Sequence, residues 1–134
     1  MHSMTSDTRP GPRRVASGSP FESRYQFCRA IRIGDRVEVA GTAPIWPDDE
    51  VDPDPRAQAR RCFAIVGEAL AELGAGFGDV VRTRMFITDL AVADAVGSVH
   101  GEVFVDGPPP ATMVVVAGLL DPRWVVEIEV EAQL

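Results

Sequence analysis

The sequence predicts an α+β fold in which two helices pack on one face of a mostly antiparallel sheet. Several segments alternate apolar and polar residues, as strands do, and two others repeat apolar residues every three or four positions, as helices do. Stretches rich in Gly, Pro and Asp separate them. The 134 residues suffice for one domain, and a content of 46% hydrophobic and 25% charged residues is ordinary for a globular protein.

The chain opens with a segment that we expect to be disordered. Residues 1–14 lack the apolar stretch of a secretory signal. We expect the domain to occupy residues 15–134. Its first elements are two predicted strands, 25–33 and 36–41. The Gly-Asp pair between these strands is typical of a tight hairpin turn.

A long helix is predicted after a loop, 42–54, that is rich in Pro and Asp. Asp54 followed by Pro55 is typical of an N-cap and a first helical position. The apolar stripe of this helix consists of Phe63, Val66, Leu70 and Leu73. Gly74 marks its end.

The second half of the chain predicts a strand, a second helix and two further strands. Residues 80–88 alternate, and Asp89 can cap a helix whose valines form one stripe. The proline run 108–110 stops this helix, because proline lacks the amide donor. Residues 111–119 are apolar on both faces, which predicts a central strand, and the alternating residues 124–134 form the last strand.

Composition argues against several classes of partner. A net charge of −7, with no lysine, disfavours binding to nucleic acid. No apolar run approaches the roughly 20 residues of a membrane helix. Cys28 and Cys62 have no CxxC spacing, which favours reduced thiols over a disulfide. No His, Cys and Asp cluster has metal-ligand spacing either. We therefore expect a cytoplasmic protein that uses no metal and binds neither nucleic acid nor a membrane.

The predicted sheet also indicates self-association. Its strands supply apolar residues on both faces, yet two helices can cover only one face. The other face must meet a second surface, and subunits that pack through the sheet would provide one.

The sequence resembles the RidA (YjgF) family, whose members are often labelled endoribonuclease L-PSP. The resemblance extends over residues 17–134. It is carried by the motifs SPFE at 19–22, VAGT at 39–42, AQAR at 57–60, GDVVRTRMFITDL at 78–90, PPATMV at 109–114 and EIE at 127–129. It implies a chorismate-mutase-like fold, a homotrimer with a small-molecule cleft between subunits, and cofactor-free hydrolysis of reactive imines or enamines to a 2-oxo acid and ammonia.

The resemblance also implies site residues. Glu127 matches the glutamate that positions the attacking water, and the Gly41 amide and the Val114 carbonyl match backbone groups of the cleft. Phe21 stands where the family has a tyrosine. Thr112 stands where active deaminases have an arginine that grips the substrate carboxylate, so this chain resembles the arginine-less subgroups of the family.

Each candidate also has a structural interpretation. Glu127 could pair with Arg82 or Arg84 across the sheet, Thr112 could be an ordinary strand residue, and Phe21 could fill the core or an interface. His100, on a predicted helix, is expected to be partly exposed. The replacement for the lost arginine stays open among Arg29, Arg82 and Arg123.

Three functions follow, in order of preference. The first is a divergent hydrolase that acts on a small imine, enamine or related metabolite, with Glu127 positioning water. The second is a non-catalytic trimer that binds a small ligand in the same cleft. The third is an endoribonuclease or translation inhibitor, which the acidic charge disfavours.

Overall fold

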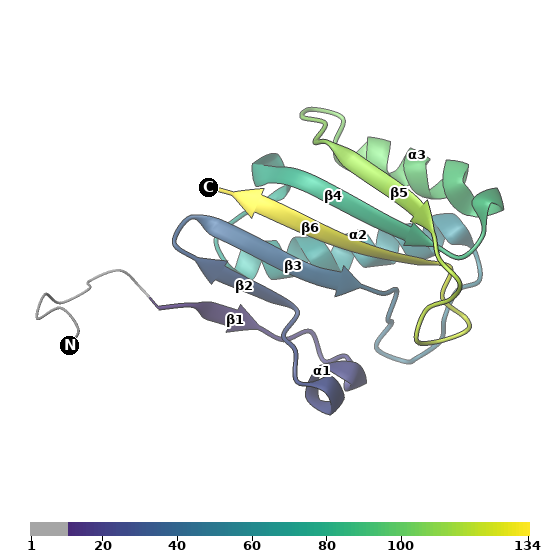
Figure 1. Ribbon diagram of the computed structural model, residues 1–134, viewed down its shortest axis with the longest axis horizontal. Helices are drawn as coiled ribbons and strands as arrows, with labels where there is room; N and C mark the ends of the chain where they lie inside the picture. The colour runs from purple at the N-terminus through teal and green to yellow at the C-terminus, as the bar shows by residue number, and fades with distance from the viewer. Residues whose placement is uncertain (1–10) are drawn as a thin grey trace, which may run out of the picture.

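A computed structural model describes residues 11–134 as a six-stranded sheet with helices packed on it (Figure 1). The strands are β1 (Arg13–Val15), β2 (Ala30–Ile33), β3 (Arg36–Thr42), β4 (Val80–Ile87), β5 (Ala111–Val115) and β6 (Val126–Gln133). The helices are α1 (Pro20–Tyr25), α2 (Pro55–Glu72) and α3 (Ala93–Val103), with short 3-10 turns at Phe77–Asp79 and Leu90–Val92. The strand order is β1-β2-β3-β6-β4-β5, and every pair is antiparallel except the parallel pair β4 and β5.

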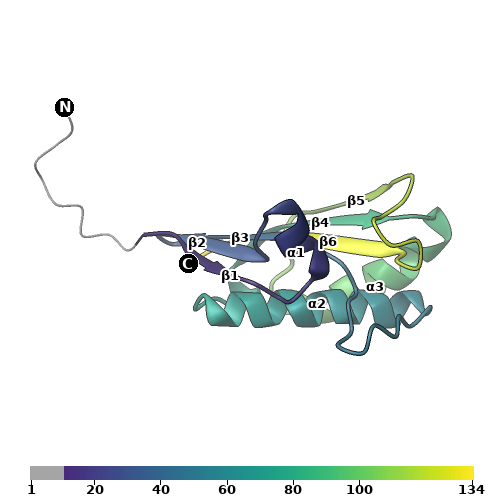
Figure 2. The same cartoon turned by 90° about the horizontal axis from the view of Figure 1, so that it is seen from below.

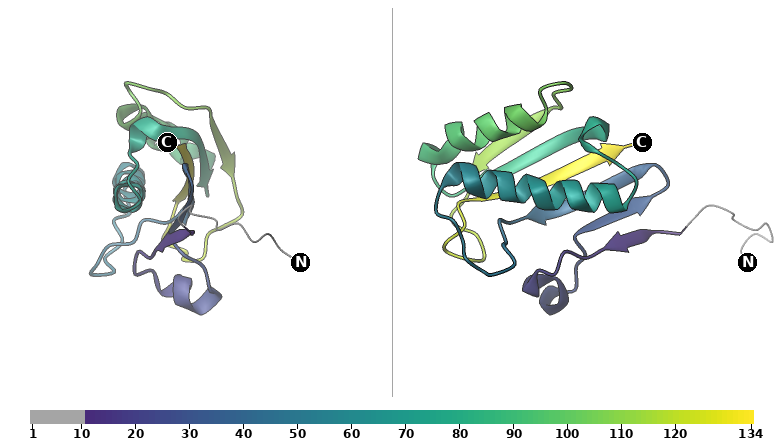
Figure 3. Two further views of the ribbon diagram at one scale, coloured as in Figure 1. Left: turned by 90° about the vertical axis from the view of Figure 1, so that its left-hand side faces the viewer. Right: turned by 180° about the vertical axis from the view of Figure 1, so that it is seen from behind.

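The predicted α+β layering is confirmed. Helices α2 and α3 cover one face of the sheet and leave the other face without a helix (Figures 2 and 3). The third helix, α1, lies beyond the β1 edge of the sheet, outside this layer (Figure 1). Within residues 11–134, no helix combines the length and the apolar character needed to cross a bilayer.

The core fills the space between the sheet and its two covering helices. The predicted stripe of α2 is buried, and Val126, Ile128 and Val130 of β6 are buried beneath it. A fully buried side chain of this size contributes roughly 1.5–3 kcal/mol to the free energy of unfolding. The alternation of β6 therefore fixes its orientation and turns its three glutamates toward the uncovered face.

The first predicted strand, 25–33, is wrong in its first half. Residues 20–25 form α1, and β2 begins only at Ala30. Ser19 caps this helix, Pro20 occupies the first turn, and Glu22 completes a capping box. Gln26 then ends the helix in the left-handed region, at φ 62°. The letters SPFE were therefore a helix start signal, which the alternation of the following residues concealed.

The prediction of a central strand at 111–119 is also wrong. Strand β5 is an edge strand, paired only with β4, and its side chains Val114 and Val115 are 43% and 53% exposed. These apolar side chains of β5 therefore lie at the surface and not in the core of this chain. The preceding prolines suit an edge, and the Pro110 carbonyl accepts a hydrogen bond from the Thr83 amide at 3.1 Å, which sets the start of the strand.

The predicted tail, 1–14, lies mostly outside the described residues. Its last two residues are part of the fold, because Arg13 and Arg14 pair with β2 as strand β1. The ordered chain thus begins earlier than residue 15.

Candidate functional site

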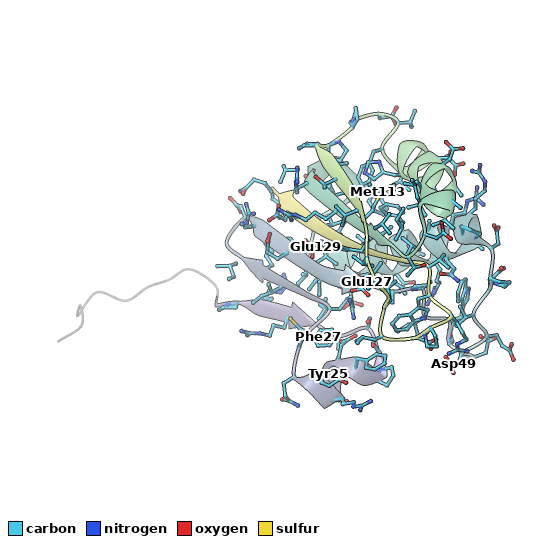
Figure 4. The ribbon with its side chains drawn as sticks, turned by 45° about the vertical axis from the view of Figure 1, so that its right-hand side comes forward. Tyr25, Phe27, Asp49, Met113, Glu127 and Glu129 are labelled. Atoms are coloured by element: carbon cyan, nitrogen blue, oxygen red, sulfur yellow. The ribbon has the colours of Figure 1, made fainter. Side chains whose placement is uncertain are left out.

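Glu127 is a half-buried carboxylate on the uncovered face of the sheet (Figure 4). It lies opposite Phe86 of β4, whereas Glu129 and Glu131 lie opposite Arg84 and Arg82. Among residues 11–134, no arginine lies within ion-pair distance of Glu127. The register therefore excludes the structural interpretation in which Glu127 pairs with one of these arginines.

The other two glutamates of β6 do follow that interpretation. Glu129 pairs with Arg84 at 3.2 Å. Glu131 pairs with Arg36 at 3.1 Å and with Arg84 at 3.6 Å. Both therefore have arginine partners, although Glu131 also faces Glu38 and its charge helps burial to raise the pKa of Glu38. Of the three carboxylates of β6, only Glu127 lacks an arginine partner among residues 11–134.

The surroundings of Glu127 make it a better base than an ordinary carboxylate. Burial raises the pKa of Glu127 above its usual value, the positive charge of Arg29 lowers it, and the nearby charge of Glu129 raises it. The net effect is a raised pKa. A carboxylate whose pKa moves toward neutrality takes a proton from water more readily.

The Glu127 carboxylate lies directly against the backbone of Gly41. A β-carbon added at residue 41 would overlap the Oε1 atom of Glu127, so only glycine leaves room for the carboxylate here. The pairing of β3 with β6 shifts register between Val39 and Thr42, which places Gly41 in an irregular part of the strand. Two of the predicted site residues are thus brought together, and for a steric reason.

Arg29, a buried residue, donates hydrogen bonds to this irregular segment of β3. It is buried, with 4% of its surface exposed, and its Nη1 atom donates to the Gly41 carbonyl at 2.5 Å and to Thr42 Oγ1 at 3.2 Å. The Thr42 hydroxyl in turn donates to the Ala40 carbonyl at 2.7 Å. One arginine therefore fixes the backbone on which the Glu127 carboxylate rests.

The charge of Arg29 is balanced by Glu22 of α1. The Nη2 atom of Arg29 donates to Glu22 at 3.3 Å, and its Nε atom donates to Ser17 Oγ at 3.1 Å. Burial alone would raise the pKa of Glu22, but hydrogen bonds from Ser17 and the charge of Arg29 outweigh it and hold that pKa below its usual value. Helix α1 is therefore connected to the site through an ionised, buried pair.

A cavity of about 390 Å³ adjoins this network on its other side. Arg29 and Thr42 form part of its wall, together with Trp46, Arg61 and Ile65. Glu127 is not in the wall and faces the uncovered sheet surface instead. The carboxylate and the cavity are therefore separate features that share Arg29.

The predicted aromatic, Phe21, lies in α1 and packs within the chain. Its ring stacks on Tyr25 at 5.9 Å between centroids and meets the buried Trp124 edge-on at 5.9 Å. A second aromatic residue, Phe27, was not among the predicted site residues, but it lies beside Arg29. It is 38% exposed, and the Arg29 guanidinium lies 5.5 Å from its ring centroid. Tyr25, Phe27 and Glu127 are shown together in Figure 4.

Thr112 and Val114 lie on β5, on the same uncovered face. Val114 pairs with Phe86 of β4, which pairs with Glu127 of β6, so these residues lie side by side across the three strands. Thr112 pairs with Arg84, two residues further from Glu127 along the sheet. The Thr112 hydroxyl accepts a hydrogen bond from Arg82 Nη2 at 2.7 Å. The structure thus places both residues beside the site and gives Thr112 an arginine neighbour.

The three arginines that could replace the lost one differ in their partners. Arg29 is held by Glu22, and Arg123 is held by Asp121 at 2.7 Å and Asp49 at 3.1 Å. Arg82 has no carboxylate within ion-pair distance in residues 11–134. Of these three arginines, Arg82 alone has no carboxylate partner in the described part of the chain.

His100 lies on the other side of the sheet. Its Nε2 atom is 2.8 Å from Thr83 Oγ1, and its ring packs on Phe104 with 4.7 Å between centroids. Burial lowers the pKa of His100. Thr83 faces the helices, whereas Glu127 faces away from them, so the sheet separates the histidine from the site.

Neither cysteine joins the site. Both are free thiols, and burial raises the pKa of Cys62, which disfavours a thiolate nucleophile. In the part of the chain from residue 11 onward, no group of three or more His, Cys, Asp or Glu side chains is arranged to hold a metal.

Comparison with known proteins connects this geometry to a family. A sequence profile described as endoribonuclease L-PSP matches residues 18–134. An uncharacterized protein of Streptomyces coelicolor is 44% identical over 121 residues, or 90% of each chain. A RutC family protein of Pyrococcus abyssi is 32% identical over 108 residues, or 79% of this chain and 83% of its own.

Solved structures agree with the sequence matches. A Mycobacterium tuberculosis protein, described as a member of the YjgF/YER057c/UK114 family, has a TM-score of 0.85 at 40% identity and covers 92% of this chain and 100% of its own. A Yersinia pestis protein of unknown function, described as a member of the Rid family, has a TM-score of 0.79 at 26% identity over 90% of this chain and 94% of its own. The chain therefore belongs to the RidA (YjgF) family.

Proposed function

We propose that this protein hydrolyses a small, reactive imine or enamine without a cofactor, and that Glu127 is the base that activates the water. The observation that carries the proposal is the state of this carboxylate. Glu127 is half-buried, has a raised pKa, lacks an arginine partner among residues 11–134, and rests against the Gly41 backbone.

The chemistry needs only these groups and one water. Glu127 takes a proton from the water as its oxygen attacks the carbon of the C=N bond, and returns that proton to the nitrogen, which gives a neutral carbinolamine. The carboxylate then takes the proton of the carbinolamine hydroxyl and delivers it to the nitrogen, so that the C–N bond breaks, a C=O bond forms and ammonia leaves. Water and imine thus give a carbonyl compound and ammonia, and no oxidant or metal is consumed.

We further propose that the working unit is a cytoplasmic homotrimer that packs through the uncovered sheet face. The exposed apolar side chain of Val114 on β5, and the absence of a covering helix on that face, support subunit contact there. A cleft between subunits would exclude bulk water from Glu127 and give the substrate a second wall.

A non-catalytic binding trimer is the second candidate. The replacement of the expected arginine by Thr112 favours it, because a substrate carboxylate has lost its usual partner at this position. The name of the matching profile suggests a ribonuclease, which ranks third because a net charge of −7 opposes RNA binding.

An imine-trapping assay separates these functions. An amino-acid oxidase generates 2-imino acids in solution, semicarbazide traps what remains, and ammonia release is followed with wild type and Glu127→Ala. We expect wild type to accelerate ammonia release and to lower the trapped imine, and Glu127→Ala to lose at least about 100-fold in rate, as general-base catalysis predicts. Binding of a 2-oxo acid without any acceleration would instead support the binding trimer. Salt-sensitive RNA binding would favour the ribonuclease.

A further inference from the structure

The cavity of about 390 Å³ between helix α2 and the loop after β3 is a feature of its own. Its volume lies within the range of about 300–1,000 Å³ that is usual for small-molecule pockets. Its wall includes Gly18 and Pro47, which are exposed, so the cavity is open to solvent. The proposed hydrolysis takes place at Glu127, outside this wall, and does not use the space.

Arg61 of α2 brings a positive charge to the wall of this cavity. Its Nε atom donates to the Ile45 carbonyl at 2.6 Å, which fixes the guanidinium in place. The N–H groups of its two Nη atoms have no hydrogen-bond partner among residues 11–134, and no carboxylate of that range lies within ion-pair distance. These donors and this charge are therefore available to a ligand.

The other charges of the wall are already balanced. Arg29 pairs with Glu22 at 3.3 Å, and Asp49 pairs with Arg123 at 3.1 Å. One guanidinium thus remains uncompensated, and it balances one negative charge. A monocarboxylate fits this count and the fork of the guanidinium. A phosphate monoester, which carries a charge of about −1.5 to −2 at neutral pH, exceeds it.

The rest of the wall suits the apolar part of an organic ligand. Ala43 and Ile65 are only 8% and 7% exposed, yet neither belongs to the cluster of buried side chains that forms the core. Both line the cavity instead, beside the half-buried indole of Trp46. A wall that combines apolar and aromatic groups with one fixed cation is typical of sites for small organic anions. An inorganic ion would leave its apolar part without a partner.

The loop that carries Trp46 is held at both ends, so the cavity is formed before a ligand enters. Arg61 binds the Ile45 carbonyl at one end. At the other end, Arg123 donates to the backbone carbonyl and to the carboxylate of Asp49, each at 3.1 Å (Figure 4). The Asp49 amide also donates to the Trp46 carbonyl at 3.0 Å, which closes a turn. A ligand would therefore pay little entropy to order this loop.

We propose that this cavity is a second ligand site, which binds a small organic monocarboxylate that has an apolar body. Arg61 holds the carboxylate, and Trp46 and Ile65 contact the apolar body. The site does not depend on the proposed function. Thr42 of β3 is in its wall, whereas the neighbouring Gly41 contacts the Glu127 carboxylate, so the two sites lie on opposite sides of this strand.

NMR titration with three probes of similar size tests the site. Phenylacetate carries one negative charge, phenylacetamide carries none, and phenyl phosphate carries nearly two. The chain has two tryptophans, Trp46 and Trp124, whose indole N–H signals are assigned with Trp46→Phe. We expect phenylacetate to shift the signal of Trp46 and not that of Trp124, which is outside the wall. Phenylacetate should bind at least about tenfold more tightly than either of the other probes.

Four variants locate the bound anion. Arg61→Met should lose at least about tenfold in affinity for phenylacetate and keep that for phenylacetamide. Ala43→Leu should weaken the binding of both probes, because the larger side chain fills part of the cavity. Arg60→Met is the matched control, since it removes the neighbouring arginine, which is exposed and pairs with Glu102. It should bind the probes as wild type does, and so should Glu127→Ala.

Several outcomes would overturn the site. These are equal binding of phenylacetate and phenylacetamide by wild type, no shift of the Trp46 signal at millimolar phenylacetate, and unchanged binding by Arg61→Met. Tighter binding of phenyl phosphate would overturn the assignment to a monocarboxylate. If Arg61→Met fails to fold, Ala43→Leu decides, because unchanged binding of both probes by that variant would place them outside the cavity. Loss of phenylacetate binding in Glu127→Ala alone would place the anion on the uncovered face.

Discussion

At the scale of single residues, the site depends on a carboxylate that its neighbours leave unpaired. Three glutamates alternate along β6, and the register gives two of them arginine partners while Phe86 stands opposite Glu127. One aromatic residue in β4 therefore decides which glutamate stays available. The sequence identified Glu127 only through the resemblance, since alternation alone treats all three glutamates alike.

Gly41→Ala should disable the site without unfolding the protein. The added methyl group would overlap the Glu127 carboxylate, which must then move away from its present position. We expect the rate of imine hydrolysis to fall by about 100-fold, while the unfolding midpoint changes by only a few degrees. Gly101→Ala is the control, because a β-carbon there meets nothing within 4 Å. Full activity in Gly41→Ala would show that the position of the carboxylate does not matter.

Glu127→Gln should stabilise the protein at neutral and alkaline pH. Burial raises the pKa of Glu127, so above that pKa the folded state bears an ionised carboxylate that the unfolded chain solvates better. Thermal unfolding should show a higher Tm for Glu127→Gln at pH 8. The difference should shrink as pH falls through the raised pKa toward about 4.3, the ordinary value for glutamate, because the folded wild type is then already protonated.

The same series with Glu102→Gln should show no such gain, because Glu102 is an exposed glutamate that pairs with Arg60. A lower Tm for Glu127→Gln at pH 8 would contradict the idea that this carboxylate is held at a cost to folding.

At the scale of elements, α1 is linked to β3 through Arg29, the residue before β2. The Glu22 and Arg29 side chains form a buried ion pair and are 7% and 4% exposed, and Arg29 also donates to the Gly41 carbonyl of β3. The alternation of residues 25–33 did not predict this connection, because it placed Arg29 only as one position of a strand. A capping box at Ser19 was visible in the letters SPFE and could have predicted α1. The contact between Glu22 and Arg29 is tertiary, so no local pattern encodes it.

Arg29→Met should be strongly destabilising. It leaves the buried carboxylate of Glu22 without its positive partner, which typically costs about 3–5 kcal/mol of the free energy of unfolding. Urea unfolding at equal protein concentration measures this loss. The double variant Arg29→Met with Glu22→Gln should recover part of it, because the uncompensated charge is gone. A single variant that loses less than about 1 kcal/mol would show that the pair does not hold α1 on the sheet.

The edge position of β5 shows a limit of sequence patterns. Residues 111–119 are apolar on both faces, and periodicity cannot distinguish a strand buried within one chain from a strand covered by another chain. The proline run was the better guide, since proline is confined to edges and strand starts. Strands β4 and β6, each with one charged face and one apolar face, bury the apolar face as their alternation predicted.

At the scale of the whole molecule, the two faces of the sheet differ in whether helices cover them. Helices α2 and α3 cover one face (Figure 2), and the other presents ion pairs beside the exposed Val114 of β5. The imbalance between apolar surface and covering helices could be counted from the sequence. The arrangement of the proposed trimer could not, because it depends on the shape of the face and not on its composition.

Val114→Asp should dissociate the proposed trimer. Val114 is 43% exposed on the uncovered face, and a buried aspartate without a partner would oppose subunit contact. Light scattering coupled to gel filtration should report a trimer for wild type and a monomer for the variant. Val105→Asp places the same charge on a valine that is 73% exposed after α3, and it should stay assembled. Wild type that runs as a monomer at micromolar concentration would contradict packing through this face.

The rate of imine hydrolysis by Glu127→Gln, relative to Glu131→Gln, tests the central claim most directly. Both substitutions neutralise a β6 carboxylate on the same face, and they differ in whether the carboxylate has an arginine partner. We predict that Glu131→Gln retains wild-type kcat/KM within about threefold, and that Glu127→Gln loses at least about 100-fold. Equal rates for the two variants would show that Glu127 is not the base.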